Sequence, residues 1–237
     1  MSLDHNTFIP SSGLVFCLDP ANLRSYSGSG NTVYNLTGES SIGATKSSGV
    51  TYNSTAPATF SSTASNYLIS DYTLASGTSF TVSMWFKRVD NAYWMSLFGN
   101  EVWFSSTGYV ARLESSRVIR FSAGGDFTGI VYDNAALISS NFNHYAFVKN
   151  TSGTDSFIYL NGVQVANGSI SNVSISKPFV FNTRYANDGN SLTDSNGSQF
   201  SHIAVYSRAL SATELKQLYY ATKRRFGYWW DNTITRS

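Results

Sequence analysis

The sequence is poor in cysteine and in long apolar runs, and each shortage excludes a class of protein. Cys17 is the single cysteine among 237 residues, so no disulfide can form within the chain. No segment approaches the roughly 20 apolar residues that a membrane-spanning helix needs, so we expect no insertion into a membrane. Residues 1–13 show neither the basic stretch nor the apolar stretch of a secretion signal, and we expect no such signal here.

Charge is also scarce, at 13% of residues with a formal net charge of +2. Arg112, Arg117 and Arg120 flank Glu114 on two predicted strands, a pattern typical of a solvated sheet face. The basic residues 223–225 fit the end of a predicted helix, where cations are favoured. We therefore expect no nucleic-acid partner.

Catalytic motifs are missing as well. A glycosidase needs two carboxyl groups about 5–5.5 Å apart, or further apart for inversion. No two of the 14 acidic residues lie within four positions of each other in the sequence. No Gly-x-Ser-x-Gly, Walker or Cys-x-x-Cys motif occurs, and the three histidines are scattered. We expect no enzymatic activity; a carboxylate pair assembled across strands is the alternative.

Aromatic residues, by contrast, make up 15% of the chain, and serine, threonine and asparagine are abundant. This mixture favours strands and turns over helices. Residues 79–88, "SFTVSMWFKR", alternate so that one face from Phe80 to Phe86 is apolar, which predicts a half-buried strand. About a dozen such short segments, "EVWFSS" at 101–106 among them, predict an all-β antiparallel sandwich or jelly roll.

Two local structures follow from turn and cap chemistry. In "FIYLNGVQVANGSIS", two apolar runs flank Asn161-Gly162, a pair that suits a type I′ turn with both residues at positive φ. Near the C-terminus, Ser211 and Glu214 have the spacing of a capping box, and Gly227 can end a helix. We therefore predict a β-hairpin and one short C-terminal helix near residues 211–225.

Four ordered blocks of the sequence resemble a known family. The first is "GLVFCLDPANLRSYSGSGNTVYNLTG", with Asn22, Ser25 and Tyr26 in its loop, and the second is "FTVSMWFKR". The third and fourth are "NHYAFVKN…FIYLNGVQVANG" and "FSHIAVYSRALSATEL". All four are similar to laminin-G-like, concanavalin-A-like jelly-roll domains found in many tailed-phage and environmental bacterial proteins.

The resemblance implies a concanavalin-A-like jelly roll over residues 13–227, between an N-terminal arm at 1–12 and an aromatic tail at 228–237. Two adjacent positions depart from the family, whose closing strand often carries an Asp-Glu pair. Ser201 and His202 stand there in this chain, which weakens any proposal of a metal or ligand at that place.

A sugar is the ligand that the sequence favours most. Sugars stack on exposed aromatic faces and need planar hydrogen-bonding groups nearby. The segment "NAYWMSLFGNEVWF" supplies Tyr93, Trp94, Trp103 and Asn100 as candidate glycan-binding residues. Half of the residues in this segment should face the core of a sandwich, so core packing is the alternative role.

Calcium is the one cofactor for which the sequence offers a candidate site. Laminin-G-like relatives often bind the ion at a sheet rim, and calcium takes six or more oxygen ligands. The loop "YANDGNSLTDSNG" carries Asp188, Asn190, Asp194 and Asn196. A polar surface loop that uses these residues in turns is the alternative.

The two ends of the chain carry apolar residues that we predict to form an interface with partner proteins. Aromatic residues are enriched in interface hot spots. The candidate interface residues are Phe8, Ile9, Tyr228, Trp229 and Trp230.

The resemblance and the missing catalytic pair together predict a non-enzymatic structural or adhesion protein of a bacteriophage virion. It would lie at the virion surface, on the capsid, neck or tail. Its partners would be other virion proteins or copies of itself, and host-surface carbohydrate. The alternative is a secreted or cell-surface carbohydrate-binding module in the bacterial extracellular space.

Overall fold

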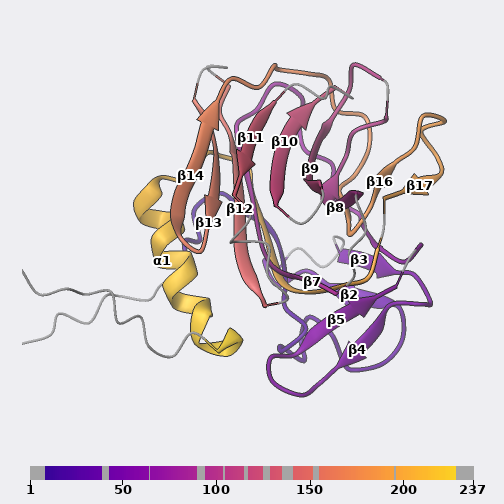
Figure 1. The fold of residues 1–237 in the computed structure, drawn as a ribbon. Coiled ribbons are helices and arrows are strands. Elements are labelled where there is room, and N and C mark those ends of the chain that lie inside the picture. Colours follow the sequence, from indigo (N-terminus) through magenta and orange to yellow (C-terminus); the bar gives the residue numbers. More distant parts are fainter. Residues whose placement is uncertain are drawn as a thin grey trace, which may run out of the picture.

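Two antiparallel β-sheets lie face to face in the computed structural model, and one helix covers the outer side of one sheet (Figure 1). The all-β sandwich with a short C-terminal helix is therefore confirmed. The structure describes residues 9–38, 43–63, 65–89, 94–103, 105–114, 117–124, 129–134, 141–151, 155–194 and 196–227.

The sheet that carries the helix is called sheet A, and the opposite sheet is called sheet B. Within the described residues, sheet A has eight strands: β1 (Leu14–Leu18), β4 (Thr51–Asn53), β5 (Thr59–Ser62), β7 (Phe80–Arg88), β12 (Asn143–Lys149), β13 (Ser156–Leu160), β14 (Val163–Gly168) and β18 (Ser198–Tyr206). Sheet B, counted over the same residues, also has eight: β2 (Thr32–Tyr34), β3 (Gly43–Lys46), β6 (Leu68–Ser70), β8 (Trp94–Gly99), β9 (Tyr109–Glu114), β10 (Val118–Ala123), β11 (Ile130–Asp133) and β15 (Val180–Phe181). A small hairpin of β16 (Arg184–Tyr185) and β17 (Leu192–Thr193) stands beside sheet B.

The strand order shows how the chain is wound. Sheet A runs β14-β13-β12-β7-β18-β5-β4, and β1 also pairs with β18. Sheet B runs β11-β10-β9-β8-β15-β6-β3-β2. Strand β18, the last strand in the described part of the chain, thus lies in the middle of sheet A, between β7 on one side and β5 and β1 on the other.

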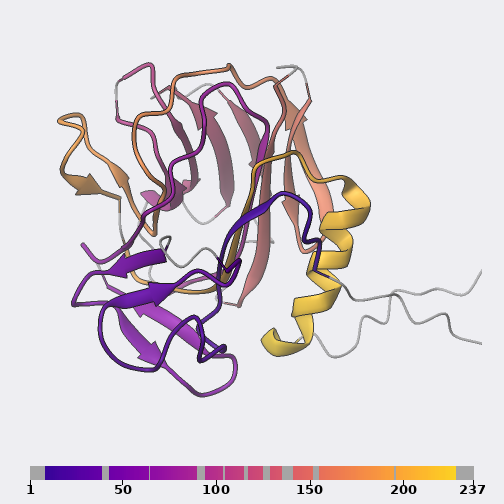
Figure 2. The ribbon, with the colours of Figure 1, turned by 180° about the vertical axis from the view of Figure 1, so that it is seen from behind.

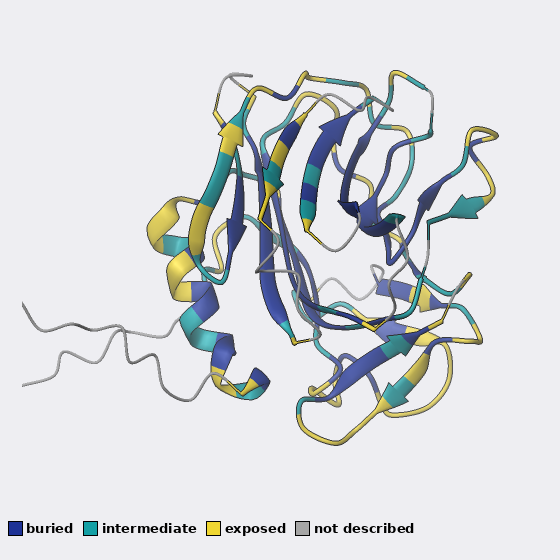
Figure 3. Ribbon diagram, in the orientation of Figure 1, coloured by how far each residue is buried: buried dark blue, intermediate teal, exposed yellow. Residues whose placement is uncertain are grey.

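Aromatic side chains fill the space between the two sheets. Phe147 on β12 of sheet A meets Phe98 on β8 and Phe121 on β10 of sheet B, in each case with ring centroids 5.5 Å apart. Each fully buried phenylalanine contributes ~1.5–3 kcal/mol of hydrophobic stabilisation. Figure 3 shows the result: the strands are mostly buried, and exposed residues gather on the turns and on the edge strand β14.

The C-terminal helix α1 (Ala212–Thr222) begins as the sequence predicts. The Ser211 side chain accepts from the backbone N–H of Glu214, and the Glu214 carboxylate accepts from the Ser211 N–H, so the capping box is present. The last turn tightens into a 3₁₀ helix, η1 (Lys223–Phe226), and Gly227 ends it at a φ of +89°. The buried face of the helix consists of Leu215, Leu218, Tyr219 and Thr222.

Strand β7 is buried on both faces, which corrects the prediction of a half-buried strand. Trp85 points away from the inter-sheet core and lies under the C-terminal helix. Its ring stacks on Phe226 at a centroid distance of 4.1 Å, and its indole N–H donates to Thr222 Oγ1 at 2.8 Å. The alternation of β7 cannot report this cover, because Thr222 lies 137 residues further along the chain.

The hairpin of β13 and β14 also supports the helix. Asn161 and Gly162 have φ values of +51° and +77°, so the predicted type I′ turn is confirmed. A Cβ atom at Gly162 would lie 3.0 Å from Tyr219 Cδ1 of α1. Asn161 Oδ1 accepts from the His144 N–H at 2.9 Å, which ties the turn to β12. The turn therefore needs glycine for its backbone conformation and for close contact with the helix.

The loop of the first family-like block is held to β1 by side chains. Ser25 Oγ accepts from the Asp19 N–H at 3.1 Å and donates to the Tyr34 carbonyl at 2.8 Å. Asn35 Oδ1 accepts from the Cys17 N–H at 2.8 Å. These residues have a structural role in joining the loop to the strand.

In the segment 101–106, predicted as a strand, the described residues lie instead in a turn between β8 and β9. The Asn100 N–H donates to the Tyr109 carbonyl at 3.0 Å, and Asn100 Oδ1 accepts from the Tyr109 N–H at 2.7 Å. The Ser105 N–H donates to the Val102 carbonyl at 3.0 Å, which closes the turn. The prediction is wrong because the side chain of Asn100 supplies the pairing that a further strand residue would have made.

Candidate functional site

The outer face of sheet B carries a row of polar side chains. Along β8, β9 and β10, alternate residues point into the core, and the residues between them point outward. Ser96, Arg112 and Arg120 face outward and are aligned across the three strands, since Ser96 pairs with Arg112 and Arg112 pairs with Arg120. The candidate site is built on this row.

Glu114, two residues after Arg112 on β9, joins the two arginines. Arg112 Nε donates to its Oε1 at 2.7 Å, and Arg120 donates through Nε to Oε1 at 2.6 Å and through Nη2 to Oε2 at 2.9 Å. Burial pushes the pKa of the Glu114 carboxyl upward, but the hydrogen bonds from Arg120 and Arg112 outweigh it and lower that pKa. Glu114 is therefore held as a carboxylate.

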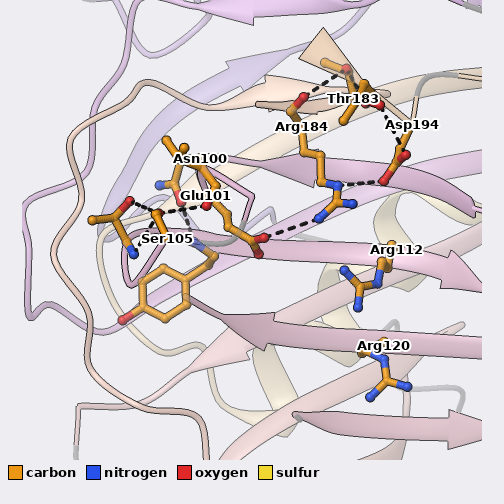
Figure 4. A network of polar contacts seen from close by, with 12 residues as sticks. Asn100, Glu101, Ser105, Arg112, Arg120, Thr183, Arg184 and Asp194 are labelled. Carbon is orange, nitrogen blue, oxygen red and sulfur yellow. Dashed lines mark hydrogen bonds and ion pairs between the residues drawn. The ribbon is translucent and has the colours of Figure 1, made fainter. Parts of the chain in front are cut away.

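A second group of charges comes from the β16–β17 hairpin and from the turn after β8. Arg184 on β16 lies between two carboxylates in Figure 4, with Nε 2.6 Å from Asp194 Oδ2 and Nη1 3.3 Å from Glu101 Oε1. The side chains of Arg184 and Glu101 are almost completely buried. Each charge is thus compensated within the protein, as buried ions require.

Two tryptophans lie against these buried arginines. The guanidinium carbon of Arg112 is 5.1 Å from the centroid of the Trp94 ring, and that of Arg184 is 4.4 Å from the Trp103 ring. Both indoles are partly exposed, whereas Arg112 and Arg184 are buried. Stacking on a cation fixes each indole in place. The site therefore presents two rigid aromatic rings above a network of paired charges.

Of the four predicted glycan-binding residues, Trp94 and Trp103 are partly exposed, and each lies against a buried arginine. Asn100 is fully buried, and its Oδ1 is engaged by the Tyr109 N–H in the turn after β8. Tyr93 lies outside the described residues. Asn100 therefore has a structural role in the turn, and glycan binding by Trp94 and Trp103 stays a prediction.

The sequence predicts a different environment for the arginine row from the one that the structure shows. Arg112 and Glu114 were expected on a solvated sheet face, yet they are 1% and 7% exposed, so this expectation is wrong. They are buried because Trp94 covers one end of the row and ion pairs replace water. The signal was the Arg-x-Glu spacing at Arg112 and Glu114, which places both side chains on one face of a strand. No local signal pointed to Arg184, since its partner Glu101 lies 83 residues away.

The predicted calcium ligands lie at opposite ends of the β16–β17 hairpin. Asp188, in the tip, accepts hydrogen bonds at Oδ1 from the backbone N–H groups of Asn190 at 2.9 Å and Ser191 at 2.8 Å. Asp194, at the base, is paired with Arg184. Among the described residues, no group of three or more His, Cys, Asp or Glu side chains could hold a metal ion. Calcium binding stays a prediction.

The predicted interface residues lie almost wholly outside the described part of the chain. This applies to Phe8, Tyr228, Trp229 and Trp230. Ile9 is described, and it is 36% exposed. As for membrane insertion, the described ranges contain no helix whose length and apolarity would let it cross a bilayer.

Comparison with known proteins identifies relatives of the whole fold. The sequence profile described as "Concanavalin A-like lectin/glucanases superfamily" matches residues 60–216. The botulinum neurotoxin serotype D ligand binding domain, solved in complex with N-acetylneuraminic acid, is similar with a TM-score of 0.65 and 14% identity, over 90% of this chain and 52% of that one. The botulinum neurotoxin serotype C1 binding domain gives 0.64 and 16%, over 87% and 51%. The binding domain of Paraclostridial Mosquitocidal Protein 1 gives 0.62 and 19%, over 87% and 52%.

At these identities the likeness shows the fold alone. The chain spans about half the length of these solved structures. No curated protein sequence matches it.

Proposed function

Because the chain belongs to the concanavalin A-like lectin/glucanases superfamily, we propose that it is a non-enzymatic glycan-binding adhesion protein of a bacteriophage virion. The observation that carries this proposal is the pair of partly exposed indoles, Trp94 and Trp103, fixed over the paired charges of sheet B. Pyranose rings bind to such surfaces by stacking their C–H faces on an aromatic ring. The solved binding domains with the same fold, one of them in complex with a sugar, support this choice of ligand class.

The carboxylates of the site favour binding over hydrolysis. A general acid of a glycosidase needs a raised pKa so that it stays protonated near neutral pH. Burial alone would raise the pKa of Glu114, but the hydrogen bonds from Arg120 and Arg112 outweigh it and lower that pKa. Glu101 and Asp194 are both paired with Arg184. None of these three groups is placed as a free proton donor, which supports the non-enzymatic assignment.

A glycan array tests the binding site. We expect the wild-type protein to bind a subset of glycans, and Trp94→Ala and Trp103→Ala each to weaken that binding about tenfold or more, since stacking is worth about 1–3 kcal/mol by analogy with other aromatic platforms. Tyr34→Ala is the matched control, because Tyr34 is an aromatic residue of sheet B that is 54% exposed and lies on β2, outside the site. Equal binding by all three variants would remove the basis of the proposal.

The absence of catalysis is tested with the same glycans in solution. Incubation with β-glucans, alginate, peptidoglycan and lipopolysaccharide should release no reducing ends. Reproducible release that Glu101→Gln abolishes would show that the protein is an enzyme.

The virion assignment has its own experiment, mass spectrometry of purified phage particles. It rests on the resemblance of the sequence to tailed-phage domains. We expect the chain among the particle proteins. Its recovery only from culture supernatant or from the bacterial surface would favour a secreted or cell-surface carbohydrate-binding module instead.

A further inference from the structure

A cavity lies on the opposite side of the sandwich from the two tryptophans. It has a volume of about 360 Å³, and the described residues that form its walls are Lys87, Asn141, Phe142, Phe226 and Gly227. Lys87 is on the outer face of β7 in sheet A, two residues beyond Trp85, and Phe226 and Gly227 follow the end of the helix. Figures 1 and 2 show that the helix and the β16–β17 hairpin are at opposite sides of the molecule.

The apolar wall of this cavity consists of two phenyl rings, one of which packs on a buried tryptophan. The rings of Phe142 and Phe226 have centroids 5.2 Å apart and are tilted by 53°. Phe226 is also stacked on Trp85 at 4.1 Å with an interplanar angle of 12°. The Trp85 indole N–H is in turn bonded to Thr222 of α1. The wall is therefore preorganised, which lowers the entropy cost of binding a flat apolar face.

The cavity also carries an excess of positive charge. Lys87 Nζ is 5.9 Å from the Phe142 ring centroid, and no carboxylate in the described part of the chain forms an ion pair with it. None of the five residues that form the walls is acidic. Within the same described ranges, the adjoining η1 adds Arg224 without an ion pair, whereas Arg225 is bonded to both oxygens of Asp19 at 2.7 and 2.8 Å.

From these features we propose that the cavity binds an acidic monosaccharide, a pyranose ring that carries a carboxylate. The apolar face of the ring lies on Phe142 and Phe226, the carboxylate is bonded to Lys87 Nζ, and hydroxyl groups reach the Asn141 amide and the Gly227 backbone. A volume of about 360 Å³ is at the small end of ligand sites and suits one sugar residue. The site is independent of the proposed glycan platform on sheet B.

The test is titration of the full-length chain with sodium glucuronate and with glucose, its neutral counterpart, followed by ligand-observed NMR. We expect glucuronate to bind about tenfold more tightly than glucose, because only glucuronate can accept a charge-assisted hydrogen bond from Lys87 Nζ. Lys87→Gln should reduce the glucuronate affinity to that of glucose. Phe142→Ala should weaken binding of both sugars.

Lys216→Gln is the matched control, since Lys216 is exposed on helix α1 and its loss changes the net charge by the same amount. Thermal melting of each variant establishes that it is folded. If Lys216→Gln lowers the glucuronate affinity as much as Lys87→Gln does, the attraction is a general effect of net charge and the assignment fails. Equal affinities of the wild-type protein for the two sugars would overturn it as well.

A truncated chain that lacks residues 228–237 tests whether these residues, rather than a sugar, occupy the cavity. These residues follow directly after Gly227, a wall residue of the cavity. Unchanged glucuronate affinity in the truncated chain supports the assignment. Binding that appears only after truncation would show that the tail, and not a sugar, is the ligand of this cavity in the intact protein. Trp94→Ala and Trp103→Ala should leave glucuronate binding at this cavity unchanged, so the two proposed sites can be confirmed or refuted independently.

Discussion

Acid should destabilise this protein through a histidine that is buried beneath the helix. His144 on β12 is completely buried, and its Nε2 lies 2.8 Å from Ser83 Oγ on β7. Its ring is also packed between Trp85 and Tyr219, at centroid distances of 5.3 and 5.9 Å. Among the described residues, no carboxylate near the ring compensates a positive charge, and the nearby His202 would oppose one. Protonation of His144 therefore conflicts with docking of the helix.

The size of the effect follows from the difference between the folded and unfolded states. Burial, followed by the interaction with His202, lowers the pKa of His144 from 6.5 to about 3. The unfolded chain takes up a proton near its ordinary pKa, so the stability contributed by the neutral ring is present above that pH and is lost as the pH falls toward 3. Each pH unit in this window removes ~1.4 kcal/mol from the free energy of unfolding. Between about pH 7.5 and 4.5, His144 should account for about 2.5 kcal/mol.

Urea unfolding followed by tryptophan fluorescence, repeated across this pH range, measures the effect in the wild-type protein and in His144→Gln. Glutamine can still bond to Ser83 but does not titrate, so the two free energies of unfolding should converge by about 2.5 kcal/mol as the pH falls. Ser83→Ala is the control: it should lose about 1 kcal/mol at every pH and keep the wild-type slope. Parallel curves for the wild-type protein and His144→Gln would refute the reasoning, because they would mean that the charged ring is accommodated.

Three further predictions concern the hairpin, the helix and the tail. Gly162→Ala should lower the free energy of unfolding by ~1–2 kcal/mol more than Gly77→Ala, because Gly77 has a similar φ of +73° but no atom within 4 Å of an added Cβ; equal losses in chemical denaturation would contradict the helix contact. Ser211→Ala should cost about 1 kcal/mol, and its combination with Glu214→Ala should cost less than the sum of the two; strict additivity in a double-mutant cycle would count against a capping box. Deletion of residues 228–237 should leave the melting temperature of the isolated protein unchanged while its incorporation into particles falls, and a collapse of stability would mean that the tail belongs to the core.

The parts of the fold that were predicted correctly depend on neighbours in the sequence. The Asn161-Gly162 turn requires two adjacent residues that accept positive φ, and the helix start requires Ser211 and Glu214 three positions apart. The errors arose where a distant segment decides the environment. Trp85 is on the outer face of β7 and would be exposed if the helix after β18 did not cover it.

Contacts between distant segments limited the prediction of the candidate site even more than that of the fold. Aromatic composition pointed to Trp94 and Trp103, but the arginines that hold them could not be assigned from spacing. Arg112 bonds to Glu114 two residues away, and that spacing indicated only that the two side chains share a face. The stacking of Arg112 on Trp94 and of Arg184 on Trp103, by contrast, joins different parts of the chain. The sequence did not predict the cavity, because its described wall residues come from β7, the segment just before β12 and the end of the helix.

The position of β18 restricts when the protein can fold during synthesis. Residues 198–206 are made after all the other strands that the structure describes, yet they pair with β7, β5 and β1. Until they leave the ribosome, these three strands lack a common neighbour, and the apolar inner face of sheet A cannot be completed. Contacts between Leu18 and Ile203 also close a loop of almost the whole domain, which is slow because its entropy cost precedes any gain. We therefore expect the nascent chain to expose unpaired strand edges until translation is almost finished, and to depend on holding chaperones in that interval.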